Sequence, residues 1–92
     1  MYLEIVSPEA TLFSGEVTSV AVPGVDGNFQ MLNNHAPIVS LLTEGFVKIT
    51  GNIVLNETVK GKFTKDDTNT TLLKIQSGTV EMKDNRVIIL VD

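Results

Sequence analysis

Apolar residues in this chain alternate with polar ones over short runs, and glycine, proline, asparagine or serine ends most of these runs. A period of two places successive side chains on opposite faces of a β-strand, whereas an amphipathic helix needs a period near 3.6. No segment sustains the helical period over a useful length. Many short strands separated by turn residues predict an all-β fold, a flattened sandwich or barrel of mostly antiparallel strands.

The turn residues divide the chain into its expected strands. Pro23-Gly24 predicts a type II turn, because proline fixes φ near −65° and glycine accepts a positive φ. Asp26-Gly27 is a second turn signal, and residues 65–69 form a predicted polar loop. Residues 53–63 are compatible with one bent strand or two. The other expected strands are 2–6, 11–13, 16–22, 28–32, 38–42, 46–50, 70–76, 79–83 and 86–91.

The last two expected strands flank Asp84-Asn85 and make the sharpest local prediction. Both turn residues tolerate left-handed φ, which a two-residue hairpin requires. In the hairpin register, the apolar residues of the two strands share one face, and two like charges lie opposite each other at the solvent-exposed end. The predicted facing pairs are Met82–Val87, Val80–Ile89 and Lys83–Arg86.

The final strand also carries Ile88 and Leu90 on its second face. A strand with two apolar faces does not suit the half-exposed edge of a sheet. Either the strand is central and covered on both sides within this chain, or another chain covers one face. We favour coverage within this chain.

The chain has 92 residues and a net charge of −4, with no cysteine. This length predicts a single domain over residues 1–92. The seven basic residues are interleaved with acids, so nucleic-acid binding is not expected. The absence of cysteine excludes disulfides and thiolate sites and favours a reducing, intracellular setting. No signal peptide and no apolar run of about 20 residues is evident, so we expect no membrane span.

His35, the only histidine, precedes Ala36-Pro37 and is the first candidate for chemistry. A zinc site needs three or four suitable ligands, and general-base catalysis needs a positioned nucleophile; the sequence offers neither around His35. Asp66-Asp67 lacks the remaining ligands of a calcium loop. No catalytic residue, metal site or cofactor is therefore predicted. The residues alone indicate a small acidic domain that binds or assembles with other molecules.

Several short motifs, in order and spacing, resemble the N-terminal β-sandwich domain of the epsilon subunit of F-type ATP synthases. The similarity is clear over residues 3–49 and 74–92 and poor over 51–73. It includes a "VPG" turn, a "HAP" corner and an "SG-x-V-E" strand start. The segments that carry the resemblance are 3–9, 12–17, 22–29, 35–37, 45–49, 77–81, 85–87 and 90–92.

The resemblance implies a sandwich of about ten strands in a non-catalytic rotor subunit of the central stalk. Such a subunit links gamma to the membrane c ring and couples proton flow to ATP synthesis made elsewhere in the complex. It lies at the cytoplasmic face of the bacterial inner membrane and meets the membrane only through the c ring. The implied contact residues are His35, Ala36 and Ser40 for gamma, and Asp26, Gly27, Asn28 and Gln30 for the c ring.

This sequence departs from the family pattern at three places. Asn28 and Gln30 stand where the family usually has Glu and Gly, so an amide hydrogen bond is expected in place of a charged contact. Asn33-Asn34 replaces Pro-Gly, and asparagine tolerates the positive φ that the corner needs. Family members continue beyond the position of Asp92 into a helical hairpin that can bind ATP or inhibit hydrolysis; if the chain is complete, such inhibition is not expected.

Two other functions stay open. A free-standing small β-sandwich that binds a ligand or a protein would show a concave apolar pocket. A small hydrolase is disfavoured because the sequence lacks paired catalytic groups.

Overall fold

A computed structural model describes all residues from 1 to 92, and its regular structure is ten β-strands with a single 3-10 turn. The predicted all-β fold class is therefore confirmed. Most expected strands lie within two residues of their predicted bounds. The elements are β1 Tyr2–Val6, β2 Thr11–Glu16, β3 Ser19–Gly24, β4 Gly27–Leu32, β5 Ile38–Leu42, β6 Gly45–Thr50, η1 Lys60–Lys62, β7 Phe63–Asp67, β8 Thr70–Ile75, β9 Gly78–Lys83 and β10 Arg86–Val91.

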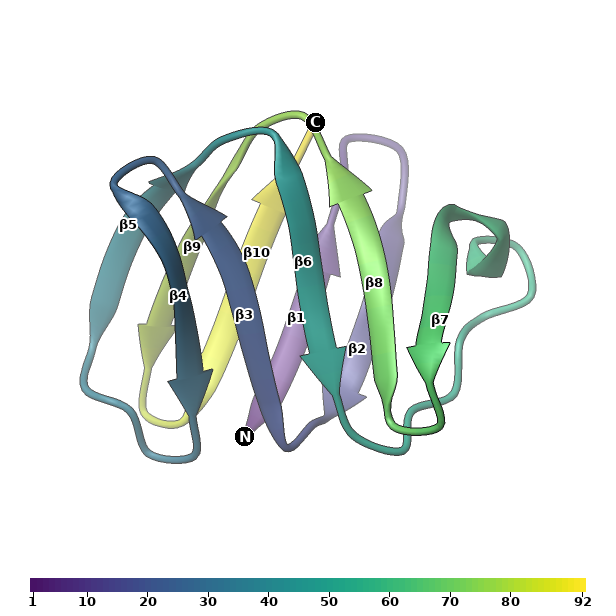
Figure 1. Cartoon of the computed structure of the whole chain (residues 1–92), viewed down its shortest axis with the longest axis horizontal. Helices are drawn as coiled ribbons and strands as arrows, with labels where there is room; N and C mark the ends of the chain where they lie inside the picture. Colours follow the sequence, from purple (N-terminus) through teal and green to yellow (C-terminus); the bar gives the residue numbers. More distant parts are fainter.

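The ten strands form one curled sheet that folds back on itself as two layers (Figure 1). One layer has the order β2-β1-β10-β9-β5, and the other has the order β4-β3-β6-β8-β7. A single residue pair, Gly24 with Leu42, connects the two layers at the corner between β3 and β5. All pairings are antiparallel except that of β1 with β10. This flattened half-barrel matches the predicted architecture.

Side chains that alternate inward along the strands build the core between the layers. It contains 22 buried hydrophobic residues drawn from both layers. Leu3, Ile5, Ile49 and Ile89 are among those with no exposed surface. Burial of each such side chain contributes about 1.5 to 3 kcal/mol, so the core supplies the main driving force for folding.

The predicted final hairpin is confirmed in turn and in register. Asp84 and Asn85 have φ values of 53° and 61°, the left-handed conformations of a two-residue turn. The three predicted pairs are all observed, and Val80, Met82, Val87 and Ile89 are buried together. The Lys83–Arg86 pair lies next to the turn, where both side chains are exposed to solvent.

β10 is central in its layer, but the expectation that this chain covers both of its faces is wrong. β1 and β9 pair with its two edges, and its inner face lies in the core. On the outer face Ile88 is 37% exposed and Leu90 is 51% exposed. No other element of the chain lies over them, so of the two predicted explanations only coverage by another chain stays open.

The predicted type II turn at Pro23-Gly24 is wrong. Both residues belong to β3, and the turn lies two residues later, at Val25-Asp26, followed by Gly27 at φ 126°. Pro23 fits in β3 although it has no N–H to donate, because its carbonyl accepts a hydrogen bond from the Thr43 N–H at 2.9 Å. Turn composition marked the right region but not the right residues.

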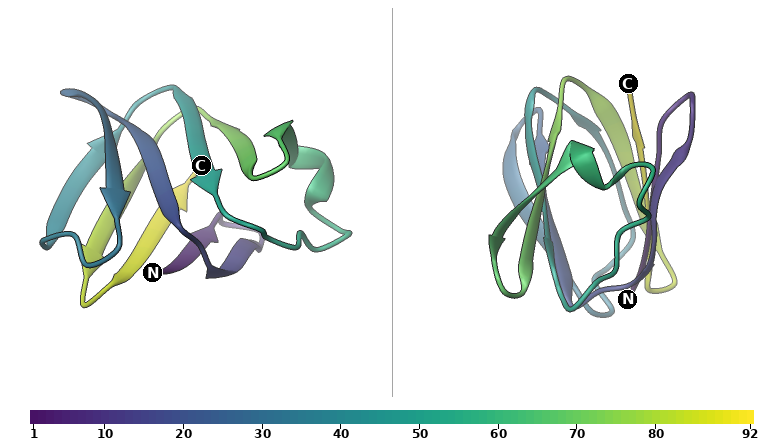
Figure 2. Two further views of the ribbon diagram at one scale, coloured as in Figure 1. Left: turned by 60° about the horizontal axis from the view of Figure 1, so that its bottom comes forward. Right: turned by 90° about the vertical axis from the view of Figure 1, so that its right-hand side faces the viewer.

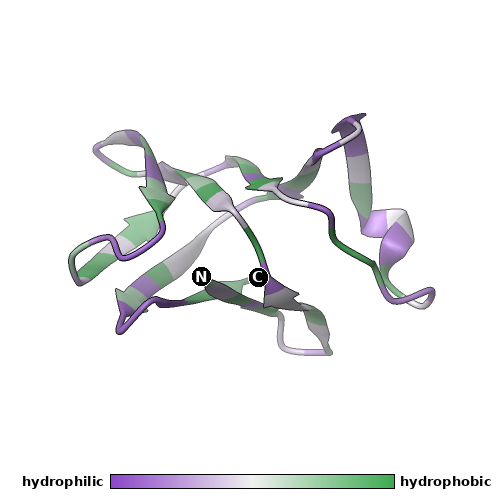
Figure 3. Cartoon of the chain, turned by 90° about the horizontal axis from the view of Figure 1, so that it is seen from below, coloured by the Kyte–Doolittle hydropathy of each residue, from purple (hydrophilic) through white to green (hydrophobic).

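The prediction of strand structure over 53–63 is also wrong. Residues 52–59 are extended or turning coil, η1 follows, and β7 begins only at Phe63. The coil passes between the two layers at the open side of the sandwich (Figure 2). Its hydrophobic run, visible in Figure 3, places Ile53 and Val59 in the core and packs Leu55 against it. Tertiary burial, rather than a hydrogen-bonded ladder, therefore fixes this segment.

The predicted polar loop over 65–69 is shorter than expected. Lys65 to Asp67 continue β7, and only Thr68-Asn69 form the turn into β8. The Asp67 carboxylate accepts the Asn69 N–H at 2.9 Å, which closes the turn locally. Charged side chains on β7 suit its place at the edge of the sheet, since they oppose pairing with other strands.

Candidate interaction surfaces

The corner that contains His35 joins β4 to β5 at the lower end of the sandwich (Figure 1). Asn34 adopts φ 62°, so asparagine does supply the left-handed residue that the sequence required. The His35 N–H donates to the Leu32 carbonyl at 3.1 Å, and its ring Nδ1 lies 2.8 Å from the Ala36 carbonyl. His35 is half-buried and Ala36 is exposed.

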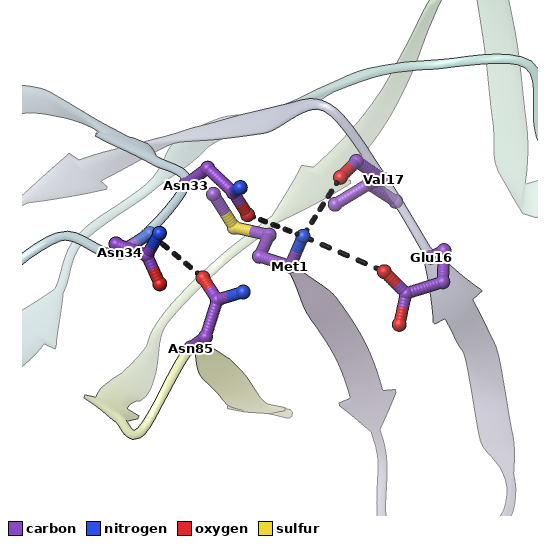
Figure 4. Close-up of polar contacts among 6 residues, drawn as sticks. All are labelled: Met1, Glu16, Val17, Asn33, Asn34 and Asn85. Carbon is purple, nitrogen blue, oxygen red and sulfur yellow. Dashed lines mark hydrogen bonds and ion pairs between the residues drawn. The ribbon is translucent and has the colours of Figure 1, made fainter.

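Two neighbouring segments hold this corner in place (Figure 4). The Met1 amino group donates to Asn33 Oδ1 at 2.8 Å, and the Asn34 N–H donates to Asn85 Oδ1 at 2.7 Å. Met1 also contacts the Val17 carbonyl at 3.3 Å. The corner is therefore fixed to the start of β1 and to the β9–β10 turn, so that His35 is presented from a rigid frame.

Ser40 lies in the middle of β5 and is half-buried. It pairs with Val80, a core residue, so its side chain is on the inner face of β5. Its hydroxyl donates to the Leu41 carbonyl at 3.0 Å. Ser40 thus shares a segment with His35 and Ala36 but lies on the opposite face of β5 from the exposed Val39 and Leu41.

The outer face of the β5-β9-β10 layer carries an exposed apolar surface that we call the outer patch. It consists of Val39, Leu41, Ile88 and Leu90, with exposures of 73%, 62%, 37% and 51%. The register connects them: Leu41 faces Thr79, which faces Leu90, and Val39 faces Glu81, which faces Ile88. The sequence pattern had indicated the β10 half of this patch. The β5 half was missed, although Ile38 to Leu42 is apolar at both alternations.

The predicted c-ring residues gather at the opposite end of the β3–β4 hairpin. Asp26, Gly27, Asn28 and Gln30 are all exposed, the first two at the turn and the others on β4. The Gln30 amide donates to the Ser19 hydroxyl at 3.2 Å. The six residues of β4 separate this turn from the His35 corner by roughly 20 Å, at about 3.3 Å a residue. The two predicted sets of contact residues are therefore distinct surfaces.

Comparison with known proteins gives a consistent result. Residues 1–92 match the family model described as ATP synthase, Delta/Epsilon chain, beta-sandwich domain. The chain belongs to this family. The resemblance seen in the sequence is thereby confirmed, including the stretch over 51–73 where the motifs were poor.

Curated relatives are named ATP synthase epsilon chain. The ATP synthase epsilon chain of Leptospira interrogans is 39% identical over 90 residues, which cover 98% of this chain and 59% of the relative. The epsilon chain of Campylobacter fetus is 40% identical over 92 residues and is covered to 60%. That of Chlorobium limicola is 36% identical and is covered to 86%. The chain thus spans about 59% of the length of the first of these epsilon chains.

A solved structure shares the fold. A chain in the central stalk and c ring of the Tetrahymena thermophila mitochondrial ATP synthase superposes with a TM-score of 0.70 at 15% identity. The match covers 98% of this chain and 61% of that one. No helix in the present structure has the length and apolar character required to cross a membrane.

Proposed function

We propose that residues 1–92 act as a single non-catalytic domain in the rotor of an F-type ATP synthase, linking the gamma subunit to the c ring. The domain contributes no chemistry; it transmits the rotation by which proton flow drives ATP synthesis in the complex. It lies peripherally at the cytoplasmic face of the bacterial inner membrane and meets the membrane only through the c ring. Membership of the epsilon family and the two separate surfaces support this role.

The outer patch is the observation that carries the gamma contact. Its four large apolar side chains come from two strands of one layer and lie on one face. Contiguous exposed apolar surface on a small domain marks an interaction site, and a lasting interface has an apolar centre inside a polar rim. Lys83 and Arg86 supply such a rim at the β9–β10 turn, and Glu81 lies between the two apolar halves of the patch.

The His35 corner extends this gamma surface at the lower end of β5. His35 and Ala36 precede β5 directly, and the bonds of Asn33 and Asn34 hold them in one conformation. A contact loop that is already ordered loses little conformational entropy on binding. Ser40 supports the contact from the inner face of β5, through its bond to the Leu41 carbonyl.

The turn at the upper end of the β3–β4 hairpin forms the proposed c-ring contact. Asp26, Gly27, Asn28 and Gln30 are exposed there, and the Asn28 side chain takes part in no hydrogen bond within the chain. Its amide can both donate to and accept from a polar loop of the ring. An amide contact is less sensitive to salt than a charged one, which suits a contact that must persist during rotation.

Capture by purified gamma and by purified c ring tests the proposal. Leu41→Glu places a charge in the outer patch, and we expect gamma capture to fall by at least about tenfold, as the loss of 1.4 kcal/mol would cause. Val54→Glu is the matched control, because Val54 is 90% exposed on the coil that follows β6 and belongs to neither proposed surface. His35→Arg should weaken gamma capture while the isolated fold persists. Equal capture of all three variants and the wild-type chain contradicts the gamma assignment.

A free-standing binding module is the alternative function. Its discriminating result is the absence of any capture by gamma or the c ring, together with unchanged ATPase coupling when the chain is omitted from the complex. The rotor proposal expects wild-type capture by both partners and a loss of coupling without the chain.

A further inference from the structure

The outer face of the second layer contains a polar trough that borders the proposed c-ring contact and has Lys48 and Thr50 on its other wall. It runs along β3, where Ser19 and Ala21 are small residues between longer side chains on β4 and β6. The register places Ala21 between Gln30 and Lys48, and Ser19 between Leu32 and Thr50. The depression has a volume of about 450 Å³, within the range of ligand sites.

The polar side chains at the walls of the trough have unused hydrogen-bonding capacity. Lys48 takes part in none of the three ion pairs of the chain, which involve Met1, Lys60 and Lys74. The side chains of Asn28, Lys48 and Thr50 make no hydrogen bond with other residues, while Gln30 is oriented by its bond to Ser19. An ammonium, an amide and a hydroxyl therefore line one concave surface without partners.

We propose that this trough is a carboxylate-binding subsite, with Lys48 as its charged group and Gln30 and Thr50 as neutral donors. Lys48 supplies the positive charge. The Thr50 hydroxyl, two residues along β6, and the second N–H of the Gln30 amide, across Ala21, can donate to the carboxylate oxygens. A single cation matches the single negative charge of a carboxylate. A phosphate dianion is bound more often by arginine forks or by several donors of the backbone at once, and this trough has neither.

Acidic residues near the trough limit its affinity. Asp67 lies across β8 from Lys48, since Lys48 pairs with Leu72 and Thr70 pairs with both Thr50 and Asp67. Its carboxylate is directed into its own turn, where it accepts the Asn69 N–H. Asp67 thus opposes a second negative charge without filling the trough, and its removal should strengthen carboxylate binding.

The first test is an NMR titration of the ¹⁵N-labelled chain with acetate, with neutral acetamide as the isosteric control. Acetate should shift the amide signals of Ala21, Lys48 and Thr50, and acetamide should not. Lys48→Gln should raise the acetate concentration at half-saturation by roughly tenfold, because one charge-assisted contact is lost. Lys74→Gln is the matched control on the same face. Because Lys74 already pairs with Glu44 at 3.8 Å, this variant should leave the titration unchanged.

Two further arms of the titration complete this test. Asp67→Asn should bind acetate more tightly than the wild-type chain. Shifts that persist in Lys48→Gln, or that are spread equally over all lysines, overturn the subsite. Inorganic phosphate that binds at least about tenfold more tightly than acetate overturns the carboxylate assignment.

The second test places the subsite in the assembly, and this step rests on the proposed function. Because Asn28 and Gln30 also belong to the proposed c-ring contact, an acidic side chain of the ring would enter the trough. We expect Lys48→Gln to weaken c-ring capture by several-fold without changing gamma capture, and Lys74→Gln to change neither. If the wild-type chain fails to capture the ring, the rotor proposal fails; if wild type and Lys48→Gln capture it equally, only the assignment of the ring as the source of the carboxylate fails.

Discussion

The β9–β10 hairpin is held in place differently from residues 51–62, the coil and 3-10 turn at the open side of the sandwich, which we call the closing segment. Every residue of the hairpin strands is paired in a ladder, and its turn residues hold the required φ values. In the closing segment, Ile53 to Leu55 make no backbone hydrogen bonds and depend on buried side chains alone. The hairpin is therefore held by backbone and core together, and residues 53–55 of the closing segment by the core alone, so the two should differ in stability and in hydrogen exchange.

The largest effect is expected from Ile89→Ala in the hairpin. Ile89 has no exposed surface, and its truncation leaves a cavity that should lower the free energy of unfolding by about 3 kcal/mol. Chemical denaturation followed by circular dichroism measures the change. Leu90→Ala, one residue away and 51% exposed, should cost less than about 1 kcal/mol. Equal costs at the two positions would contradict the assigned faces of β10.

A smaller effect is expected from Ile53→Ala in the closing segment. Ile53 is 9% exposed and is attached by side-chain burial alone, so the segment can relax into the space and the cost should be roughly 1 to 2 kcal/mol. Val54→Ala, at a side chain 90% exposed, should change stability by less than about 0.5 kcal/mol. Hydrogen exchange should be fast at residues 53–55 and slow in β10. Slow exchange at residues 53–55 would contradict the absence of backbone hydrogen bonds there.

A pair of turn variants sharpens the hairpin side of the comparison. Asn85→Ala and Asn85→Gly both remove the bond that Asn85 Oδ1 accepts from the Asn34 N–H. Only alanine is strained at φ 61°, so the glycine variant should be more stable by roughly 0.5 to 1 kcal/mol. Thermal unfolding of the two proteins measures this difference. An alanine variant as stable as the glycine variant would show that the turn changes its conformation.

The smallest effect concerns Asp67 at the end of β7. The backbone N–H of Asn69 and the Thr70 hydroxyl hold the pKa of the Asp67 carboxyl below its ordinary value of 3.8. A lowered folded-state pKa stabilises the fold above the unfolded pKa, and this contribution disappears as the pH falls through the folded value. Asp67→Asn should therefore lower the Tm slightly at pH 7, and the difference should shrink as the pH falls below 3.8 and vanish once the folded-state carboxyl is protonated. A difference that is independent of pH would mean that charge plays no part.

How far the sequence predicts this structure depends on where the stabilising contacts lie. In the final hairpin, turn type, register and core face follow from neighbours within 13 residues, and all were predicted. Residues 53–63 were misassigned because an apolar run predicts burial but not the partner that buries it. Pro23-Gly24 was placed in a turn because local composition does not reveal that β3 pairs with β6 only up to Ala21 and with β5 only at Gly24, which leaves Pro23 unpaired on that side.

The candidate surfaces show the same division. The apolar second face of β10 was visible in the sequence as two residues, Ile88 and Leu90, yet its extension onto Val39 and Leu41 requires the β5–β9 pairing. Lys48 was missed because one lysine on a strand is an ordinary solubilising residue. Only the small side chains of the neighbouring strand turn its surroundings into a depression.

The β3–β4 hairpin places the His35 corner and the proposed c-ring turn at its opposite ends, with six facing residue pairs between them. If gamma holds one end and the c ring holds the other, as proposed, a pulling force between them acts along the strand axes. Such a load runs along the covalent backbone of β4, which joins the turn to the His35 corner, whereas a load across the strands opens their hydrogen bonds one after another. The geometry that keeps the two contacts apart therefore also loads the β3–β4 hairpin along its strands, which is its mechanically stiffest direction.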